Sequence, residues 1–529
     1  MTDSLSMKKE HHMFWRRMRM LGAAAAAVTV LAACAGEGAQ GVPSPERPLK
    51  VVGQFELHSL DPSTSGGFFT RLQVAETLVD ADLRGALQPG LATGWETSPD
   101  GLTWRFPLRP DALFHDGTSV TAAAVADALK TARTKAGTPL AAVPVTAISA
   151  DGGNVRVALA KPFAPLAAVL AHTSTQILAP SSYGPDRTVT TVVGSGPYRV
   201  ERLEQPATIE LTAFEQWQGT KPAITEVNYQ AAGRSESRAL MAESGQADVT
   251  FGMDPTSLQR LKQAGKLTIA DVTLPRTILL KVNAGHAILG DVRIRRALSM
   301  ALDRDSMATA LLRDPEMAAT QLFPPSLPEW HQDAITPLAH DPSGARELLA
   351  EAGWRPGSGG ILEQGGRKFS VTLRTFPDRP ELPVIATAVQ AKLKELGIAV
   401  DVKVGNSSEI PAGHQDGSLE LGLYARNYAL VPDALVTLAD DFGPDGADYG
   451  AMGWNSTELT STLDTMAGTA DADVLNSGRQ QVTKILQSEL PVIPVAWYRQ
   501  SAVVSPRVEG LVLDPLERSW RLTELSWAK

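Results

Sequence analysis

The sequence predicts an α/β fold with mixed sheets. Helical and strand-like patterns alternate along the chain after residue 48, which is typical of proteins that pack helices onto sheets. Hydrophobic residues make up 43% of the 529 residues and are spread evenly after residue 48, so the chain can form large buried cores. A chain of this length corresponds to about three domain-sized units.

The predicted elements of the first half are each bounded by a capping or breaking residue. They are, in order, a strand over Leu49–Phe55, a helix that Ser119 or Thr121 caps and that runs to about Arg133, and a helix over Ser235–Ser244 that Gly245 ends before a strand over Ala247–Phe251.

The second half repeats this alternation of helix and strand. Asp341 and Pro342 open a helix, because proline is tolerated in the first turn, and Gly353 follows its end. The next elements are a helix over Pro383–Leu396, a break at Gly397, and a half-buried strand over Ile398–Val404. The loop 355–366 contains five glycines and is expected to be a surface hairpin tip.

Cys34, the only cysteine, marks the N-terminal segment as a secretion signal. Basic residues come first, and residues 21–33 then carry no charge, which is the pattern of a signal peptide over residues 1–33. Thirteen apolar residues are too few to span a bilayer. Leu31–Cys34 resembles the lipobox of bacterial lipoproteins, which implies lipidation of the Cys34 thiol; a buried apolar cysteine is the alternative. Residues 34–48, rich in glycine and proline, are expected to be a flexible tether.

The net charge argues against nucleic acid as a partner. Removing the five basic and two acidic residues of the signal leaves 44 basic against 56 acidic residues, a net charge of −12. Nucleic-acid binding depends largely on basic residues that neutralise phosphates.

The histidines do not predict a metal site. His11 and His12 belong to the signal, and the other seven of the nine lie far apart, with no pair at helical spacing. His115, in a turn over 114–117, is expected to bond the backbone. His58, in the loop after the first strand, is kept as a candidate ligand contact.

Catalytic and phosphate-binding motifs are also missing from the sequence. Gly194-Ser195-Gly196 lacks the spacing of a nucleophile elbow, and Pro197 stands where a phosphate-binding helix would donate an N–H group. We therefore expect no catalytic residues, no cofactor and no enzymatic activity.

Several sequence runs resemble one family of binding proteins. They are Leu87–Ala92, Trp95 with Ser98–Gly101, Trp104–Arg109, Phe114–Gly117, Gly194–Tyr198, Gly245–Asp248, Asp291–Leu298 and Pro491–Pro494. Together they resemble the signature of the family 5 solute-binding proteins of bacterial ABC importers, which bind peptides, nickel or opines. The resemblance covers nearly all of residues 49–529.

The resemblance implies a two-lobe periplasmic-binding-protein type II fold with an extra inserted domain. The solute is enclosed when the lobes close, and the closed form docks on the permease. The expected segments are 49–86, 195–275 and 500–529 for lobe I, 87–194 for the inserted domain II, and 276–499 for lobe II.

The segment Leu423–Tyr428 is the first candidate for solute recognition. Peptide binders of the family carry an aspartate there that pairs with the peptide's α-amino group, and Arg426 stands at that position. Because an arginine holds a carboxylate, we expect an anionic solute, with Asn427 and Tyr428 beside it. The alternative is that Arg426 lies one residue out of register and pairs with a surface acid. Replacing Arg426 by Ala is expected to weaken solute binding with little effect on folding.

The second candidate wall is the loop after the first strand. Phe68, Phe69 and Arg71 match the family's ligand-facing loop, and adjacent aromatic side chains suit a pocket wall. Packing at the start of a helix is the alternative for the two phenylalanines.

The spacing of several runs is closest to the nickel-binding branch, which receives metals chelated by carboxylate-bearing molecules. The chain departs from that branch at Thr173 and Gln176, where the branch has arginines, and at Val431–Ala434, which replaces a histidine-containing run. The expected solute is therefore a small peptide or an opine-like metal chelate, with no metal ligands from the protein.

The expected function is that of a monomeric solute-binding lipoprotein, in the periplasm or on the outer face of the cell membrane, that delivers its solute to ABC permease subunits. The alternative is a receptor that presents the solute to a membrane sensor without transport. Importer genes beside this one would favour transport, and a sensor kinase gene would favour the alternative. An extracytoplasmic acyl-transfer enzyme is a third hypothesis, which the missing catalytic motifs weaken.

We predict that Cys34→Ala releases the protein from the membrane fraction, because the several acyl chains of a lipoprotein hold firmly whereas the polypeptide offers no other anchor in its sequence. Fractionation with a carbonate wash measures the effect. Quantitative pelleting of the variant with membranes would show that the anchor lies elsewhere.

Overall fold

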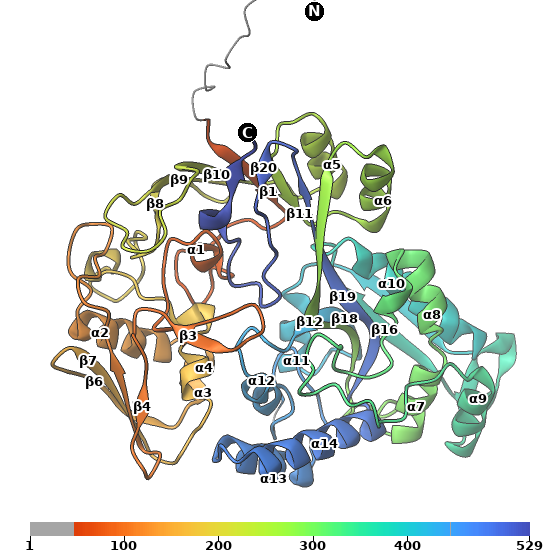
Figure 1. The fold of residues 1–529 in the computed structure, drawn as a ribbon. Coiled ribbons are helices and arrows are strands. Elements are labelled where there is room, and N and C mark those ends of the chain that lie inside the picture. The colour runs from red at the N-terminus through yellow and green to blue at the C-terminus, as the bar shows by residue number, and fades with distance from the viewer. Residues whose placement is uncertain (1–46, 445) are drawn as a thin grey trace, which may run out of the picture. The chain divides into compact units, whose positions relative to one another are not determined.

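A ten-stranded mixed sheet runs through the protein in the order β17-β16-β18-β12-β19-β11-β1-β10-β9-β8 (Figure 1). Its strands are β1 (Leu49–Gly53), β8 (Tyr198–Glu204), β9 (Thr208–Ala213), β10 (Glu226–Ala231), β11 (Val249–Phe251), β12 (Thr268–Val282), β16 (Ser370–Thr375), β17 (Ala399–Val404), β18 (Leu421–Asn427) and β19 (Val492–Val504). The computed structural model describes residues 47–444 and 446–529, so Cys34, the signal and most of the tether lie outside the described residues.

Two long antiparallel strands, β12 and β19, join the two halves of the sheet. They pair from Thr268 opposite Val504 to Lys281 opposite Val492. At one end β19 also pairs with β11, and at the other end β12 pairs with β18. The β12–β19 pairing shifts register after Leu274 and again after Ile278, so the ladder is irregular midway between the halves. This mixed α/β architecture confirms the predicted fold class.

The first lobe is built on the β11-β1-β10-β9-β8 half of the sheet. β1 runs parallel to β10 and β11. Its core takes in apolar residues of these strands, of helix α1 (Phe68–Arg71) and of the C-terminal segment, including Leu513 and Leu525. Helices α5 (Ser235–Glu243) and α6 (Pro255–Ala264) belong to the same half (Figure 1).

The second lobe is built on β16, β17 and β18 and has the largest core cluster of the described residues. Its helices are α7 (Val292–Met300), α9 (Pro342–Glu351), α10 (Glu381–Glu395), α12 (Ala434–Asp441), α13 (Thr457–Ala467) and α14 (Ala472–Glu489). β16 runs parallel to both β17 and β18.

A separate four-stranded sheet, ordered β4-β5-β7-β6, lies in the orange part of Figure 1. Its strands are β4 (Glu96–Thr97), β5 (Thr103–Pro107), β6 (Val145–Asp151) and β7 (Asn154–Leu159), and helix α2 (Ala122–Arg133) packs on it. This sheet falls within the segment 87–194 that the sequence assigns to an inserted domain, and its core also takes in Leu78, Val79, Val431 and Val436 from outside that segment. The exact segment boundaries stay a prediction.

The local signals in the sequence predict the helix starts well. Thr121 caps α2 by accepting a hydrogen bond from the Ala124 amide, and Asp341 caps α9 in the same way from Gly344. The helix expected from Pro383 begins two residues earlier, at Glu381. The glycine-rich loop 355–366 forms a small three-stranded sheet with the chain that follows it, through β13 (Arg355–Pro356), β14 (Leu362–Gln364) and β15 (Arg367–Lys368).

The Gly194-Ser195-Gly196 run has a packing role. A Cβ atom on Gly194 would lie 2.0 Å from the Val74 carbonyl oxygen, and one on Gly196 would lie 2.2 Å from that of Gln73. Only glycine allows the two backbones to approach this closely. Ser195 donates a hydrogen bond of 2.7 Å to the carboxylate of Glu76, so its hydroxyl is engaged by an acid.

Candidate functional site

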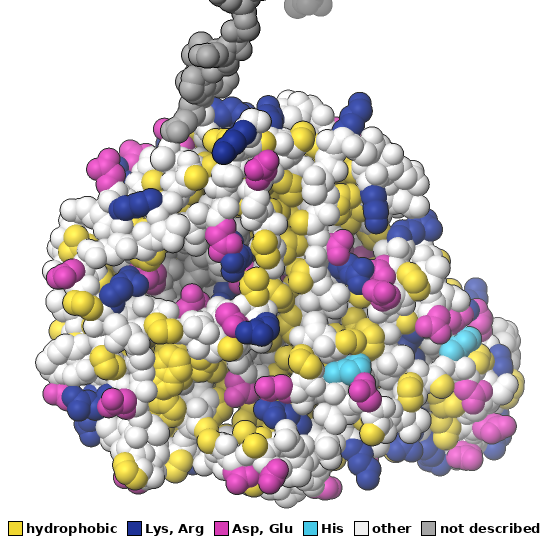
Figure 2. Space-filling view, in the orientation of Figure 1, with side chains coloured by type: hydrophobic (Ala, Val, Ile, Leu, Met, Phe, Trp, Pro, Cys, Tyr) yellow, Lys and Arg dark blue, Asp and Glu magenta, His cyan; other side chains and the backbone are white. Residues whose placement is uncertain are grey.

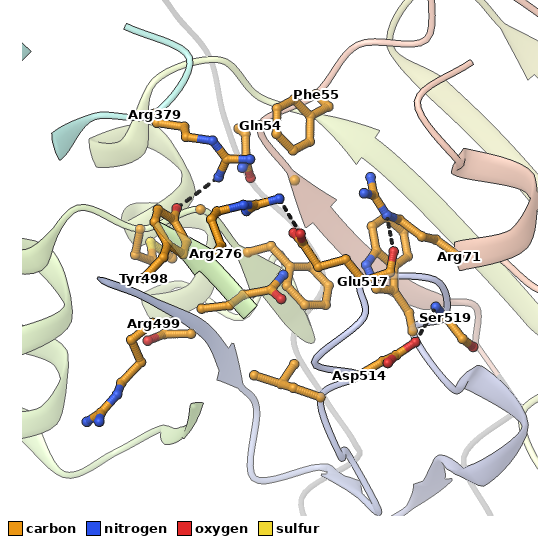
Figure 3. A pocket seen from close by; sticks show the side chains of 18 of the residues that line it. Gln54, Phe55, Arg71, Arg276, Arg379, Tyr498, Arg499, Asp514, Glu517 and Ser519 are labelled. Carbon is orange, nitrogen blue, oxygen red and sulfur yellow. Dashed lines mark hydrogen bonds and ion pairs between the residues drawn. The ribbon is translucent and has the colours of Figure 1, made fainter. Parts of the chain in front are cut away.

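A small cavity of about 70 Å³ lies beside β12 and β19, where the two lobes meet (Figure 3). It opens beyond Gly53 and Phe251, the carboxyl ends of the parallel strands β1 and β11, which is the usual place for a ligand in an open α/β sheet. The charged side chains that line it are Arg71, Arg276, Arg379, Arg499, Asp514 and Glu517.

Arg276 is the most buried arginine of the cavity. It lies on β12, is 5% exposed, and donates from Nη2 to the carboxylate of Glu517. Its Nε and Nη1 atoms have no hydrogen-bond partner among the described residues. Burial, together with the positive charge of Arg379, lowers the pKa of Arg276 to about 10, so the guanidinium still carries its charge at neutral pH.

Arg379 and Arg71 bring positive charge from opposite lobes. Arg379, just before α10 in the second lobe, donates to the Tyr498 hydroxyl at 2.9 Å and stacks over the Tyr498 ring at 5.0 Å. Arg71, at the end of α1 in the first lobe, donates from Nε to the Glu517 carbonyl at 2.9 Å. The fourth arginine, Arg499, points away from the others (Figure 3).

Glu517 is the carboxylate at the centre of these arginines. The Asp514 side chain holds its turn by accepting hydrogen bonds from the amides of Leu516, Arg518 and Ser519 at 2.9 to 3.0 Å. Glu517 itself has a left-handed backbone, with φ of 57°, which is uncommon for a residue other than glycine. The turn aims its side chain into the cavity, toward Arg276 (Figure 3).

Four groups fix the charge of Glu517, one amide and three arginines. Asn427, at the end of β18, donates to its carboxylate at 2.8 Å beside the bond from Arg276. Burial would raise the pKa of the Glu517 carboxyl, but the charges of Arg276, Arg71 and Arg379 outweigh it and hold that pKa below its usual range. The carboxylate is therefore ionised and links the first lobe to Asn427 of the second.

Aromatic side chains form one wall of the cavity. The Trp520 ring stacks on Phe251 at 5.0 Å and on Tyr229 at 5.4 Å between ring centroids. The Trp520 amide donates to the Arg71 carbonyl at 2.9 Å, so this wall is tied to α1. Stacked rings give a rigid apolar surface next to the charged groups.

This arrangement suits an anion. Arg499 is already paired, at 2.7 Å with Asp314 and 2.9 Å with Glu316, and Asp514 is occupied by its turn. Arg71, Arg276 and Arg379 remain around Glu517, with Glu381 near Arg379. Guanidinium groups in a site of low water content bind carboxylates by charge-assisted hydrogen bonds.

Metal ligands are not gathered in the described chain. Among residues 47–444 and 446–529, no group of three or more His, Cys, Asp or Glu side chains is placed to hold a metal ion.

No helix within the same ranges is long and apolar enough to cross a membrane. His115 bonds the Gly196 carbonyl at 2.9 Å, as the sequence predicted for a backbone contact.

The structure places two of the residues predicted from sequence at the cavity. Arg71 lines it, and Asn427 holds Glu517. Phe68 and Phe69 lie in the core of the first lobe, 3% and 0% exposed, with Phe68 packed edge-on against Tyr229. They do not line this cavity, and their packing is that of the start of a helix.

Tyr428 and His58 lie elsewhere. Tyr428 is buried in the second lobe and packs edge-on against Phe323 at 5.4 Å. The His58 side chain is exposed and lies 3.2 Å from the Glu56 carboxylate. A solute contact of either residue stays a prediction.

Arg426 is engaged by an acid of its own lobe. Its Nε and Nη2 atoms donate to the two carboxylate oxygens of Asp441 at 2.7 and 2.6 Å. Asp441, at the end of α12, is completely buried, so it is not the surface acid of the alternative considered above. The expectation that Arg426 could be removed with little effect on folding is revised, because removal leaves this carboxylate buried without its partner.

Arg276, Arg379 and Glu517 are not among the site residues predicted from the sequence. One signal was present for Arg276, an arginine within the long apolar run that forms the buried part of β12. Glu517 gave no such signal, because it lies in an irregular segment 241 residues from Arg276.

The outer surface carries no large patch of one charge on the face drawn in Figure 2, where basic and acidic side chains are interspersed. The concentration of positive charge in the cavity is therefore a local feature and does not extend over that face.

Comparison with known proteins gives a consistent set of relatives. The family description "Bacterial extracellular solute-binding proteins, family 5 Middle" matches residues 86–447. The chain is similar to the nickel-binding periplasmic protein of Escherichia coli (strain K12), 24% identical over 480 residues, which cover 88% of this chain and 91% of that protein. It is also similar to the probable D,D-dipeptide-binding periplasmic protein DdpA of the same organism, 25% identical over 449 residues, or 82% of this chain and 84% of DdpA.

Among solved structures, NikA from Brucella suis in complex with Fe(III)-EDTA superposes with a TM-score of 0.83. It is 24% identical, and the match covers 91% of this chain and 100% of that chain. The likeness establishes the two-lobe periplasmic-binding-protein fold.

We predict that Arg426→Ala lowers the free energy of unfolding by about 3–5 kcal/mol, because the Asp441 carboxylate is left buried and unpaired. Urea denaturation measures the effect. The control is Arg367→Ala, at an exposed arginine in β15, which should change stability by less than about 0.5 kcal/mol. A loss equally small for Arg426→Ala would show that the ion pair with Asp441 does not support the fold.

Proposed function

The chain belongs to the bacterial extracellular solute-binding proteins, family 5, and from this premise we propose that it is the solute-binding component of an ABC importer, specific for a small carboxylate-bearing solute. Family membership places the protein outside the cytoplasm and among binding proteins. The solute class, the residues that contact it and the permease partner are the proposed part.

The arginines of the cavity are the main support for an anionic solute. In the cavity between the lobes, Arg71, Arg276 and Arg379 surround the ionised carboxylate of Glu517, and Arg276 has two donor atoms without a partner among the described residues. A buried excess of guanidinium donors is costly unless an anion offsets it. An anionic solute supplies that charge.

The position of the arginines also gives a means of closure. Arg71 belongs to the first lobe and Arg379 to the second, while Arg276 lies on β12 between them. An anion that contacts Arg71 and Arg379 together interacts more strongly with the closed form than with the open form. Only such a difference in affinity shifts the equilibrium toward closure.

The relatives indicate which anions to consider. NikA from Brucella suis was solved with Fe(III)-EDTA, a metal held by carboxylates, and the relatives named for dipeptides suggest acidic peptides as the other class. The described residues offer no metal-binding group, so a metal would enter as a chelate whose carboxylates contact the arginines. Chelates and acidic peptides are therefore the proposed solutes.

Only some of the site residues predicted from sequence have a role at the cavity. Arg71 contacts the solute and Asn427 holds Glu517 in place. A direct contact of Arg426, Tyr428, Phe68, Phe69 or His58 with the solute is retained as the prediction from sequence. The protein acts as a monomeric binding protein without catalysis, and Cys34 anchors it to the membrane through the tether.

We predict that carboxylate-rich solutes, such as citrate or nickel complexes of histidine, raise the melting temperature more than neutral dipeptides of similar size do. A ligand at a hundred times its dissociation constant adds about 2.7 kcal/mol to the free energy of unfolding, which gives a clear shift. Differential scanning fluorimetry with matched ionic strength measures it. The largest shifts from simple dipeptides with free amino termini, with none from chelates, would contradict an anion site.

A further inference from the structure

We propose that Glu517 is a built-in substitute for a carboxylate of the solute, and that the solute carries at least two carboxylates, one of which replaces Glu517 on Arg276. The inference rests on the proposed function, because it assumes that the cavity between the lobes is the binding site. It adds the number of charges on the solute and the group that the solute displaces.

The contacts of Glu517 are those expected for a bound carboxylate. Its side chain is 9% exposed and accepts hydrogen bonds from Arg276 and from Asn427 Nδ2, the latter at 2.8 Å. Glu517 belongs to the first lobe, whereas Asn427 belongs to the second. The carboxylate therefore bridges the lobes, as a solute must when it is enclosed between them.

Glu517 leaves the arginines incompletely satisfied. Arg276 Nε and Nη1 have no partner within the described part of the chain, although the residue is 5% exposed. Arg379 makes one hydrogen bond, to a neutral tyrosine hydroxyl. Glu381 also acts on Arg379, and burial raises the pKa of the Glu381 carboxyl. Two carboxylates, Glu517 and Glu381, thus lie near three guanidinium groups, and Arg276 keeps two donor atoms without a partner among the described residues.

The geometry suits a compact solute with two carboxylates. The guanidinium groups of Arg276 and Arg379 lie 5.1 and 5.0 Å from the centre of the same Tyr498 ring, so they are within about 10 Å of each other. Two carboxylates separated by a few bonds reach both groups. A solute with a single carboxylate replaces one negative charge at Arg276 by another. Its net gain in binding free energy is therefore small.

The cavity as it stands is small for such a solute. Its volume of about 70 Å³ is well below the roughly 300 Å³ typical of small-molecule sites. A cavity of about 750 Å³ shares the lining residues Tyr498 and Arg499, and one of about 320 Å³ shares Asp514 and Ser519, the two ends of the Glu517 turn. Withdrawal of the turn would join the small cavity to the one of about 320 Å³, so displacement of Glu517 adds space.

Calorimetry with citrate and acetate at constant ionic strength tests the exchange. The wild-type protein should bind citrate and bind acetate at least about 100-fold more weakly. In Glu517→Gln the competing carboxylate is removed, so citrate should bind about tenfold more tightly and acetate binding should become measurable. The matched control is Glu509→Gln, at an exposed glutamate of the same C-terminal segment, which should behave as the wild type.

The outcomes separate the two proposals. Equal citrate affinity in the wild type and Glu517→Gln overturns the exchange and leaves the anion site standing. Absence of citrate binding to the wild type overturns the anion site, and the exchange with it. If Glu517→Gln does not fold, hydrogen–deuterium exchange of residues 511–520 in the wild type decides. Citrate should speed it, because the turn loses its contacts to Arg276 and Arg71, and unchanged or slower exchange overturns the proposal.

Discussion

The buried ion pair between Arg276 and Glu517 is the interaction on which the site depends. A guanidinium on a strand shared by both lobes is removed from water, and its charge must be offset by a nearby anion. The protein offsets it with a carboxylate from the C-terminal segment of the first lobe, held in a turn by Asp514. Asn427 then ties that carboxylate to the second lobe. The Glu517 carboxylate thus neutralises Arg276 and also connects the two lobes.

The same constraint gives the proposed solute a way to couple its binding to closure of the lobes. β12 and β19 continue from one lobe into the other, and their pairing is irregular in the middle, close to Arg276. Arginines from both lobes converge on this point from separate elements. In the proposed function, an anion placed there contacts both lobes together, so its binding energy favours the closed arrangement.

Features that depend on local chemistry could be predicted from the sequence. Thr121 and Asp341 cap their helices because a short polar side chain reaches an amide three residues ahead. The residue type and the spacing that make this cap are both present in the local sequence. Arg276 and Glu517 meet across 241 residues, and no local pattern reports such a contact. Arg426 illustrates the difference: its identity suggested an anion partner, and only the structure shows that Asp441, fifteen residues further on, is a partner within the protein.

Native mass spectrometry of the protein purified from the cells that make it can identify the charge and mass of the bound solute. We expect a non-covalent adduct whose mass corresponds to a solute bearing at least two carboxylates, either free or as a metal complex, and which is lost in Arg276→Met. An adduct of a neutral or cationic solute, retained in Arg276→Met, would contradict this expectation.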